Sequence, residues 1–206
     1  MKKIGLTGSI GMGKSTTAGF FRDAGIPVFD ADAIVHALYS KGGEAVSAIA
    51  ERFSGAVKEG AVDREALSAI LRQNPKEFAA LEGIVHPLVA ARRATFIERA
   101  EKDGLALIVF DIPLLFETGQ DDAYDIILVV TADPEIQAQR VLARPGMTPE
   151  KFQSILARQM PDAEKRNRAD FIIDTSHGLE PARKQAHDII ETLNARAKQT
   201  RQSPDA

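Results

Sequence analysis

The chain of 206 residues contains no cysteine. This absence excludes disulfide bonds, thiolate metal ligands and a cysteine nucleophile, and it fits a reducing cytoplasm. No apolar run in the sequence approaches the roughly 20 residues that a membrane-spanning helix needs. Positive charge is not in excess either, because the formal net charge is −3, whereas a general nucleic-acid binder needs a basic surface. We therefore expect neither a membrane nor a nucleic acid among the partners.

Metal-ligand patterns and repeats are also lacking. The sequence has four histidines, none of them at the spacing of metal ligands. What is present is the composition of a globular protein, with 44% hydrophobic and 27% charged residues. At this length we expect one domain with insertions. The sequence carries no signal for an oligomeric state.

The most informative segment is residues 8–15, which read Gly-Ser-Ile-Gly-Met-Gly-Lys-Ser and match G-x-x-x-x-G-K-[ST]. A strand-like run (2–7) precedes the segment and a helical stretch (16–24) follows it, which is the context that this motif needs. Such a loop turns successive N–H groups toward phosphate oxygens, while Lys14 reaches the β- and γ-phosphates and the Ser15 hydroxyl binds Mg²⁺. The segment predicts binding of a nucleoside triphosphate, with an accidental glycine turn as the alternative.

Short apolar runs alternate with helical stretches along the rest of the chain, which favours an α/β fold: a P-loop NTPase-like, mostly parallel sheet flanked by helices. The further predicted strands are 26–29, 105–110, 126–130 and 171–173, and the main helices are 33–39, 45–53, 64–72, 76–84, 87–102, 135–143 and 181–196. The predicted nucleotide-binding core comprises residues 1–32, 103–139 and 169–195. Residues 33–102 are predicted as a helical substrate-binding insertion, 140–168 as a basic lid, and 196–206 as a flexible polar tail.

Two carboxylates follow the second predicted strand, in Asp30-Ala31-Asp32. In open α/β sheets, ligands bind outside the carboxyl ends of the strands. A hydroxyl that attacks a γ-phosphate needs a nearby carboxylate to accept its proton. Asp32 is our candidate base, with Asp30 as a supporting neighbour, and capping of the following helix is the alternative for both.

A third carboxylate, Asp111, closes the strand 105–110, and Glu117 lies just downstream. A second acidic residue for Mg²⁺ usually follows such a strand in phosphate-loop enzymes. Asp also commonly opens turns, so a turn residue before Pro113 is an equal alternative for Asp111.

The basic segment offers two arginines on one helix face, because Arg140 and Arg144 are four residues apart. Guanidinium groups are suited to neutralising the charge that develops on a transferring phosphoryl group. A solvated charged face is the alternative for this pair.

Several segments, taken together and in this order, resemble the dephospho-CoA kinase family over residues 4 to about 190. The phosphate loop alone is shared by many kinases, whereas the Asp-Ala-Asp and Pro-Leu-Leu-Phe-Glu segments are much more specific. The segments are Ile4 to Ser15, Asp30-Ala-Asp-Ala-Ile-Val-His36, Val62-Asp-Arg-Glu-Ala-Leu67, Leu81-Glu-Gly-Ile-Val-His-Pro87, Asp111-Ile-Pro-Leu-Leu-Phe-Glu117, Gln159-Met160 and Ala169-Asp-Phe-Ile-Ile-Asp174.

The resemblance implies transfer of the γ-phosphate of ATP to the ribose 3′-hydroxyl of dephospho-coenzyme A, the last step of coenzyme A synthesis, with Mg²⁺ as cofactor. It implies that Asp32 is the catalytic base and that Lys14 and Arg140 act on the phosphates. The ATP loop would comprise Gly11, Met12, Gly13, Lys14, Ser15 and Thr16, the acceptor side Asp30, Arg64, His86 and Glu117, and the adenine contact the backbone of residues 175–178.

Two alternatives stay open. Another small-molecule or nucleoside monophosphate kinase would share the core, the loop and the lid. A GTPase-type switch is suggested by Asn167-Arg-Ala-Asp170, but this motif should follow a strand, and here it precedes the strand-like run 171–173.

Overall fold

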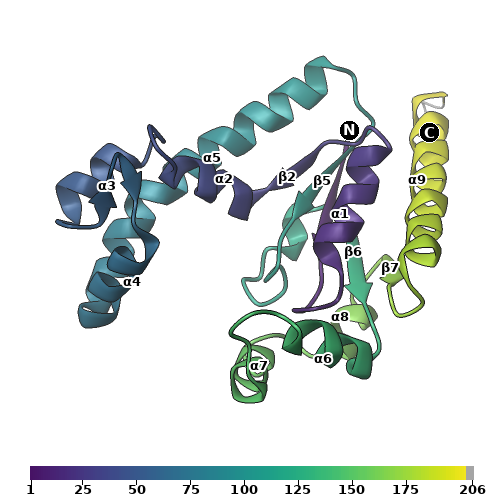
Figure 1. Ribbon diagram of the computed structural model, residues 1–206. Helices are drawn as coiled ribbons and strands as arrows, with labels where there is room; N and C mark the ends of the chain where they lie inside the picture. Colours follow the sequence, from purple (N-terminus) through teal and green to yellow (C-terminus); the bar gives the residue numbers. More distant parts are fainter. Residues whose placement is uncertain (203–206) are drawn as a thin grey trace. The chain divides into compact units, whose positions relative to one another are not determined.

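A computed structural model describes residues 1–202 of the chain (Figure 1). The chain divides into two compact units. Unit 1 consists of Met1–Phe29 and the chain from Ala100 onward, and unit 2 is Asp30–Arg99.

Unit 1 is built on a five-stranded sheet with the strand order β2-β5-β1-β6-β7. Strand β1 lies in the middle and pairs in parallel with both β5 and β6, and β6 pairs in parallel with β7. The carboxyl end of β1, between two parallel neighbours, is where ligands bind in open α/β sheets. The strands are β1 (Lys2–Thr7), β2 (Val28–Asp30), β5 (Leu107–Asp111), β6 (Ile126–Thr131) and β7 (Phe171–Asp174).

The strands of this sheet are largely buried, so the sheet is covered by other parts of the chain. Helices α1 and α9 pack side by side over one face, and α6, α7 and α8 gather at one end of the strands (Figure 1). Phe21 of α1 packs in one core with Leu128 and Ile173 of the sheet, and Leu115, Phe116 and Val129 belong to a smaller cluster. The helices are α1 (Lys14–Asp23), η2 (Asp121–Ala123), α6 (Pro134–Leu142), α7 (Pro149–Leu156), α8 (Asp162–Asn167) and α9 (Leu179–Gln202).

Unit 2 is helical and has a hydrophobic core of its own around Leu38, Ile49, Phe53 and Leu67. A short antiparallel hairpin, which the sequence did not predict, joins two of its helices. Its elements are α2 (Ala31–Tyr39), α3 (Val46–Arg52), β3 (Val57–Lys58), β4 (Ala61–Val62), α4 (Arg64–Gln73), η1 (Pro75–Glu77) and α5 (Phe78–Lys102), the last of which continues into unit 1.

The predicted α/β fold with mostly parallel strands is confirmed. The prediction of two helices, 76–84 and 87–102, is wrong, because α5 continues through Pro87. Proline lacks an N–H, so it removes one helical hydrogen bond, and neighbouring turns maintain the helix here. The tail predicted from residue 196 is helical through Gln202, because α9 extends that far, and residues 203–206 lie outside the described part.

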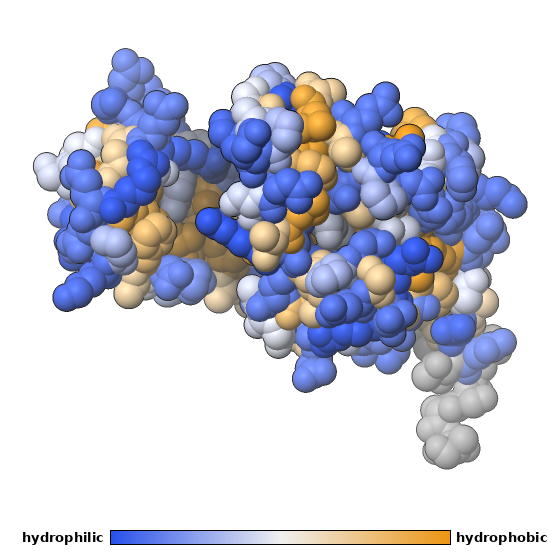
Figure 2. Space-filling view, turned by 90° about the horizontal axis from the view of Figure 1, so that it is seen from below, coloured by the Kyte–Doolittle hydropathy of each residue, from blue (hydrophilic) through white to orange (hydrophobic). Residues whose placement is uncertain are grey.

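Hydrophilic residues dominate the face of the molecule drawn in Figure 2, with hydrophobic strips between them. Within residues 1–202, no helix is both long and apolar enough to span a membrane.

Candidate active site

The segment between β1 and α1 is a glycine loop whose backbone approaches its neighbours too closely for side chains. A Cβ at Gly8 would lie 2.6 Å from the carbonyl oxygen of Val130 in β6. A Cβ at Gly11 would lie 2.5 Å from Cγ2 of Val141 in α6, and Gly11 also has a φ of +79°. Gly8 requires glycine because of its contact, and Gly11 because of both its contact and its left-handed conformation.

Three successive carbonyls of this loop accept hydrogen bonds from the surrounding protein. The side chain of Gln137 donates to Ile10 O at 2.7 Å. Arg140 Nη1 lies 3.5 Å from Gly11 O, and the Thr175 hydroxyl donates to Met12 O at 2.8 Å. The loop therefore keeps its carbonyl oxygens toward the protein, as an anion-binding loop must.

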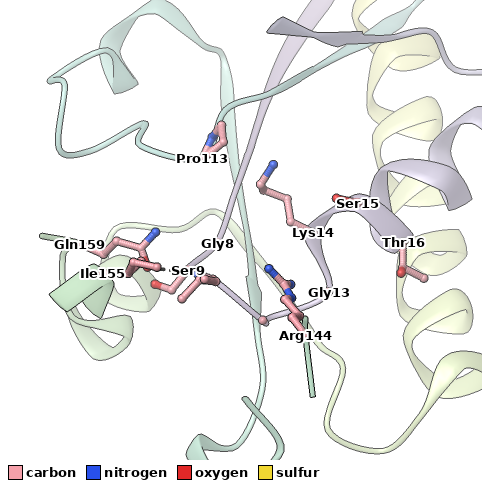
Figure 3. A pocket seen from close by; sticks show the side chains of 12 residues that line it. Gly8, Ser9, Gly13, Lys14, Ser15, Thr16, Pro113, Arg144, Ile155 and Gln159 are labelled. Carbon is pink, nitrogen blue, oxygen red and sulfur yellow. Dashed lines mark hydrogen bonds between the residues drawn. The ribbon is translucent and has the colours of Figure 1, made fainter. Parts of the chain in front are cut away.

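A cavity of about 390 Å³ opens beside the loop (Figure 3). Gln159 and Ile155 lie on one side of it, and Lys14 and Arg144 lie opposite them. The cavity is lined by Gly8, Ser9, Ile10, Gly11, Gly13, Lys14, Ser15, Thr16, Pro113, Arg144, Ile155 and Gln159. Of the predicted loop residues only Met12 does not line it, since its side chain is 3% exposed and packs in the core. We call this the phosphate cavity.

Lys14 forms an ion pair with Asp111, at the carboxyl end of the neighbouring strand β5. Asp111 is 5% exposed, and a carboxylate that is so buried needs a charged partner. The ammonium and carboxylate groups predicted for phosphate and metal chemistry are therefore adjacent.

A second cavity, of about 290 Å³, shares Gly11, Gly13, Thr16 and Arg144 with the phosphate cavity. Its remaining wall includes apolar side chains, as is usual in binding sites for small molecules. The rest of the lining is Phe20, Arg140, Thr175, Gly178, Leu179 and Ala182. We call this the nucleoside cavity; the predicted adenine segment 175–178 contributes to it.

The two arginines of the basic segment differ in position. Arg140 donates to the Thr175 hydroxyl at 2.7 Å and to the Thr175 carbonyl at 2.8 Å, and it lines only the nucleoside cavity. Arg144 lines both cavities. Arg144 is thus the arginine that lines the phosphate cavity, whereas Arg140 contacts the loop carbonyl of Gly11 and the Thr175 segment.

Glu117 lies in unit 1, with one oxygen of its carboxylate bound to protein groups. Glu117 Oε1 accepts a hydrogen bond from Met160 N–H at 2.7 Å and lies 2.8 Å from Nζ of Lys165. Lys165 is fully buried. Burial by itself raises the pKa of Glu117, but the contacts with Lys165 and Met160 outweigh it, so this pKa lies below its usual value. Glu117 thus connects the segment after β5 with Met160 and with α8.

Unit 2 contains a cavity of about 470 Å³ that is lined by two of the predicted site residues, Asp32 and Arg64. Asp32 lies in the first turn of α2, and Arg64 opens α4, with its guanidinium 5.6 Å from the centre of the Tyr39 ring. The other lining residues are mostly apolar: Val35, Tyr39, Leu67, Ser68, Leu71 and Leu81. We call this the acceptor cavity.

The other predicted acceptor residues, Asp30 and His86 as well as Glu117, do not line this cavity. Asp30 caps α2, because its carboxylate accepts a hydrogen bond from Ala33 N–H at 2.9 Å. His86 is exposed on α5, within the helix and not at the helix start that the sequence suggested.

Sequence reasoning missed the side chains that hold the loop from outside. Gln137, Gln159 and Thr175 contact the loop, and Lys165 neutralises Glu117. Glutamine and threonine carry no motif of their own. The pair Gln159-Met160 was noted only as part of a family resemblance.

Comparison with known proteins decides the family. The family model described as dephospho-CoA kinase matches residues 2–180. The chain belongs to the dephospho-CoA kinase family.

A dephospho-CoA kinase of Rhodopseudomonas palustris is 55% identical over 191 residues, which cover 93% of this chain and 95% of that protein. A dephospho-CoA kinase of Agrobacterium fabrum is also 55% identical, over 93% of this chain and 98% of its own length. The crystal structure of the protein TT1252 from Thermus thermophilus has a TM-score of 0.75 at 34% identity, covering 93% of this chain and 96% of its own.

This dephospho-CoA kinase family member is therefore a phosphotransferase with an alcohol group as acceptor, and it uses ATP. Family membership supports the final, ATP-dependent step of coenzyme A synthesis and does not favour a different small-molecule kinase or a GTPase-type switch.

Proposed function

We propose that the protein phosphorylates the ribose 3′-hydroxyl of dephospho-coenzyme A in a single in-line transfer from ATP, with Mg²⁺ bound to the nucleotide. The observation that carries this proposal is the pair of cavities around one glycine loop, together with a separate acceptor cavity lined by Asp32 and Arg64.

On the donor side, the triphosphate would occupy the phosphate cavity and the base the nucleoside cavity. The shared lining residues Gly11, Gly13 and Thr16 support this, because one continuous ligand can then extend across both. Lys14 would release Asp111 and bind the β- and γ-phosphates. ATP supplies the charge that replaces the carboxylate as partner of the ammonium.

The residues near Lys14 suit Mg²⁺, a hard cation that prefers oxygen ligands. Ser15 offers an exposed hydroxyl in the first turn of α1, and Asp111 offers a carboxylate at the end of β5. Ser15 would hold the ion directly, and the ion would supply positive charge to the phosphates.

On the acceptor side, Asp32 would accept the proton of the attacking hydroxyl. Arg64 would bind an anionic or ribose group of dephospho-coenzyme A, and Tyr39 orients its guanidinium through the ring contact. The apolar wall of the acceptor cavity suits the uncharged parts of this substrate. Residues 33–102 would thus be the acceptor domain.

Charge that develops on the transferred phosphoryl group would be neutralised by Arg144, which lines the phosphate cavity. Arg140 would support the loop and border the base. Residues 140–168 would act as a lid that excludes water and so suppresses hydrolysis of ATP. We place the reaction in the cytoplasm, since a cysteine-free chain suits a reducing compartment, and we include no nucleic acid or membrane among the partners.

A phosphorylation assay that offers dephospho-coenzyme A beside nucleosides and nucleoside monophosphates tests this proposal. We expect a clear preference for dephospho-coenzyme A, with the new phosphate at the 3′-position by NMR. Preference for a nucleoside or a nucleoside monophosphate would replace the proposal by the alternative of another P-loop kinase.

A further inference from the structure

Two glutamines from different segments hold the two peptide groups that flank one residue of the phosphate loop, Ile10. Gln137 in α6 donates from Nε2 to Ile10 O at 2.7 Å, and Gln159, in the segment between α7 and α8, accepts from Ile10 N–H at 3.1 Å. Gln137 is only 6% exposed, and buried amide groups require partners. The Ile10 residue thus has both its N–H and its C=O held by side chains.

The position of this residue in the loop makes the contact consequential. Ile10 precedes Gly11, whose φ of +79° lies in the left-handed region. Glycine gives the backbone wide freedom, so a glycine loop needs external contacts to remain in one conformation. Restraining Ile10 fixes the start of the turn that leads to Lys14.

Gln159 is itself held in place by the residue that follows it. Met160 N–H donates to Glu117 at 2.7 Å, and the fully buried Lys165 pairs with the same carboxylate oxygen at 2.8 Å. A fully buried lysine with one carboxylate partner restricts both partners strongly, because leaving either one alone is costly. The backbone next to Gln159 is therefore held by Glu117, through contacts that do not involve the phosphate loop.

In Figure 3, Gln159 reaches toward the loop near Ser9, across the phosphate cavity from Lys14 and Arg144. Gln159 belongs to the basic segment, whereas Ile10 belongs to the loop. The hydrogen bond between them thus connects this segment to the loop, in addition to the contact of Arg140 with Gly11 O.

We propose that Gln159 is a positioning residue that, with Gln137, holds the loop in its anion-binding conformation and couples the basic segment to ATP affinity. Without the acceptor oxygen of Gln159, the loop populates several conformations, of which only a fraction can bind ATP. The apparent dissociation constant for ATP then rises by the inverse of the competent fraction. This inference rests on the proposed function only for the identity of the nucleotide.

The decisive variant is Gln159→Met, which keeps the length of the side chain and removes the acceptor oxygen. We expect ATP binding about tenfold weaker by titration calorimetry, since one hydrogen bond is worth a factor of this order. The KM for ATP rises by the same factor, while kcat at saturating ATP stays within about twofold, because bound ATP restores the loop. A merely structural role would lower the melting temperature and the active fraction and leave the KM for ATP unchanged.

Gln153→Met is the matched control, because Gln153 is exposed on α7 in the same segment. Its ATP affinity should equal that of the wild type. If methionine at position 159 does not fit, Gln159→Ala repeats the measurement without a bulky side chain.

A double-mutant cycle with Gln137→Met tests whether both side chains restrain the same residue, Ile10. We expect the double variant to bind ATP clearly better than the product of the two single effects predicts, because Ile10 is already released after the first loss. Unchanged ATP affinity in Gln159→Met, or strictly additive effects, would overturn the inference. Failure of the wild type itself to bind ATP would instead overturn the proposed function.

Discussion

The phosphate cavity of unit 1 and the acceptor cavity of unit 2 are built from different parts of the chain. Around the phosphate cavity, glycines bring the backbone close to its neighbours and side chains hold loop carbonyls from behind. The acceptor cavity is lined by side chains of three helices, α2, α4 and α5, including Asp32, Arg64 and Leu81. A phosphate is common to many substrates and is bound by backbone N–H groups, whereas a particular acceptor has to be distinguished by side chains.

The largest loss is expected on the donor side, from Lys14→Met. Removing the ammonium should lower kcat/KM for ATP by about 10³-fold, because a preorganised charge at the phosphates is lost. Steady-state kinetics at varied ATP measures this loss, and the melting temperature reports separately on the broken ion pair with Asp111.

Lys184→Met is the control for this experiment, because Lys184 is exposed on α9 in the same unit. A small effect of Lys14→Met would mean that the backbone alone binds the phosphates. The phosphate cavity would then act through its backbone only, and the acceptor cavity through its side chains.

The next largest effect is expected on the acceptor side, from Asp32→Asn. Turnover should fall by about 10²-fold, since the amide cannot accept the proton. Affinity for ATP, measured by calorimetry, should stay at the wild-type value because Asp32 lines only the acceptor cavity among those described.

Asp30→Asn serves as the matched variant, because asparagine also caps helices and preserves the start of α2. It should retain most of the turnover. If Asp30→Asn loses as much turnover as Asp32→Asn, the role of the base cannot be assigned to Asp32 alone. The acceptor side would then also depend on Asp30, which does not line the acceptor cavity.

The same contrast explains what the sequence could predict. The strand, loop and helix around residues 8–15 are encoded by consecutive residues, so β1 was predicted with the bounds that it has, Lys2–Thr7. Helix α5 was divided in two because a proline inside a helix looks like a boundary when its neighbours are unknown. Local sequence therefore predicts the backbone of the donor site well.

Contacts between distant segments could not be predicted in this way. Gln159 contacts Ile10, 149 residues away, and no local pattern distinguishes such a glutamine from a surface residue. Glu117 was expected on the acceptor side, and no local pattern indicated that its carboxylate pairs with a buried lysine of α8. From the sequence, only the family resemblance placed Asp32 and Arg64 in the same site. In the structure the two residues line one cavity.

A smaller effect on turnover is expected from Arg144→Ala, roughly 30-fold, because a charge-assisted contact to the transferred phosphoryl group is lost. Arg140→Ala should instead raise the KM for ATP, since Arg140 lines the nucleoside cavity and binds Thr175. Comparison of kcat with KM for ATP in both variants checks this division. If kcat falls in Arg140→Ala alone, the arginine that neutralises the transferred phosphoryl group is Arg140 and not Arg144.

The smallest effect on turnover and a clear effect on stability are expected from Glu117→Gln. Glutamine still offers an oxygen to Met160 N–H, so the anchor of Gln159 persists, but Lys165 keeps its buried charge without a counter-ion. Breaking a buried pair on one side typically costs about 3–5 kcal/mol. Urea unfolding at pH 7 should therefore show a lower free energy of unfolding, and Glu117→Gln/Lys165→Met should recover much of it because neither charge remains.

The pH dependence of this difference gives the sharpest form of the prediction. The pKa of Glu117 in the folded protein is held below its usual value, which is about 4.3 in unfolded chains. A carboxylate with a lowered pKa stabilises the fold fully above the unfolded value, and this contribution disappears as the pH falls through the folded value. The stability difference between wild type and Glu117→Gln should thus be constant from pH 7 to about pH 5 and shrink at lower pH. A stability difference that stays constant down to pH 3 would mean that the charge of Glu117 does not stabilise its contacts with Met160 and Lys165. The conformation of the phosphate loop would then have to be maintained by contacts of the loop other than those that depend on Glu117.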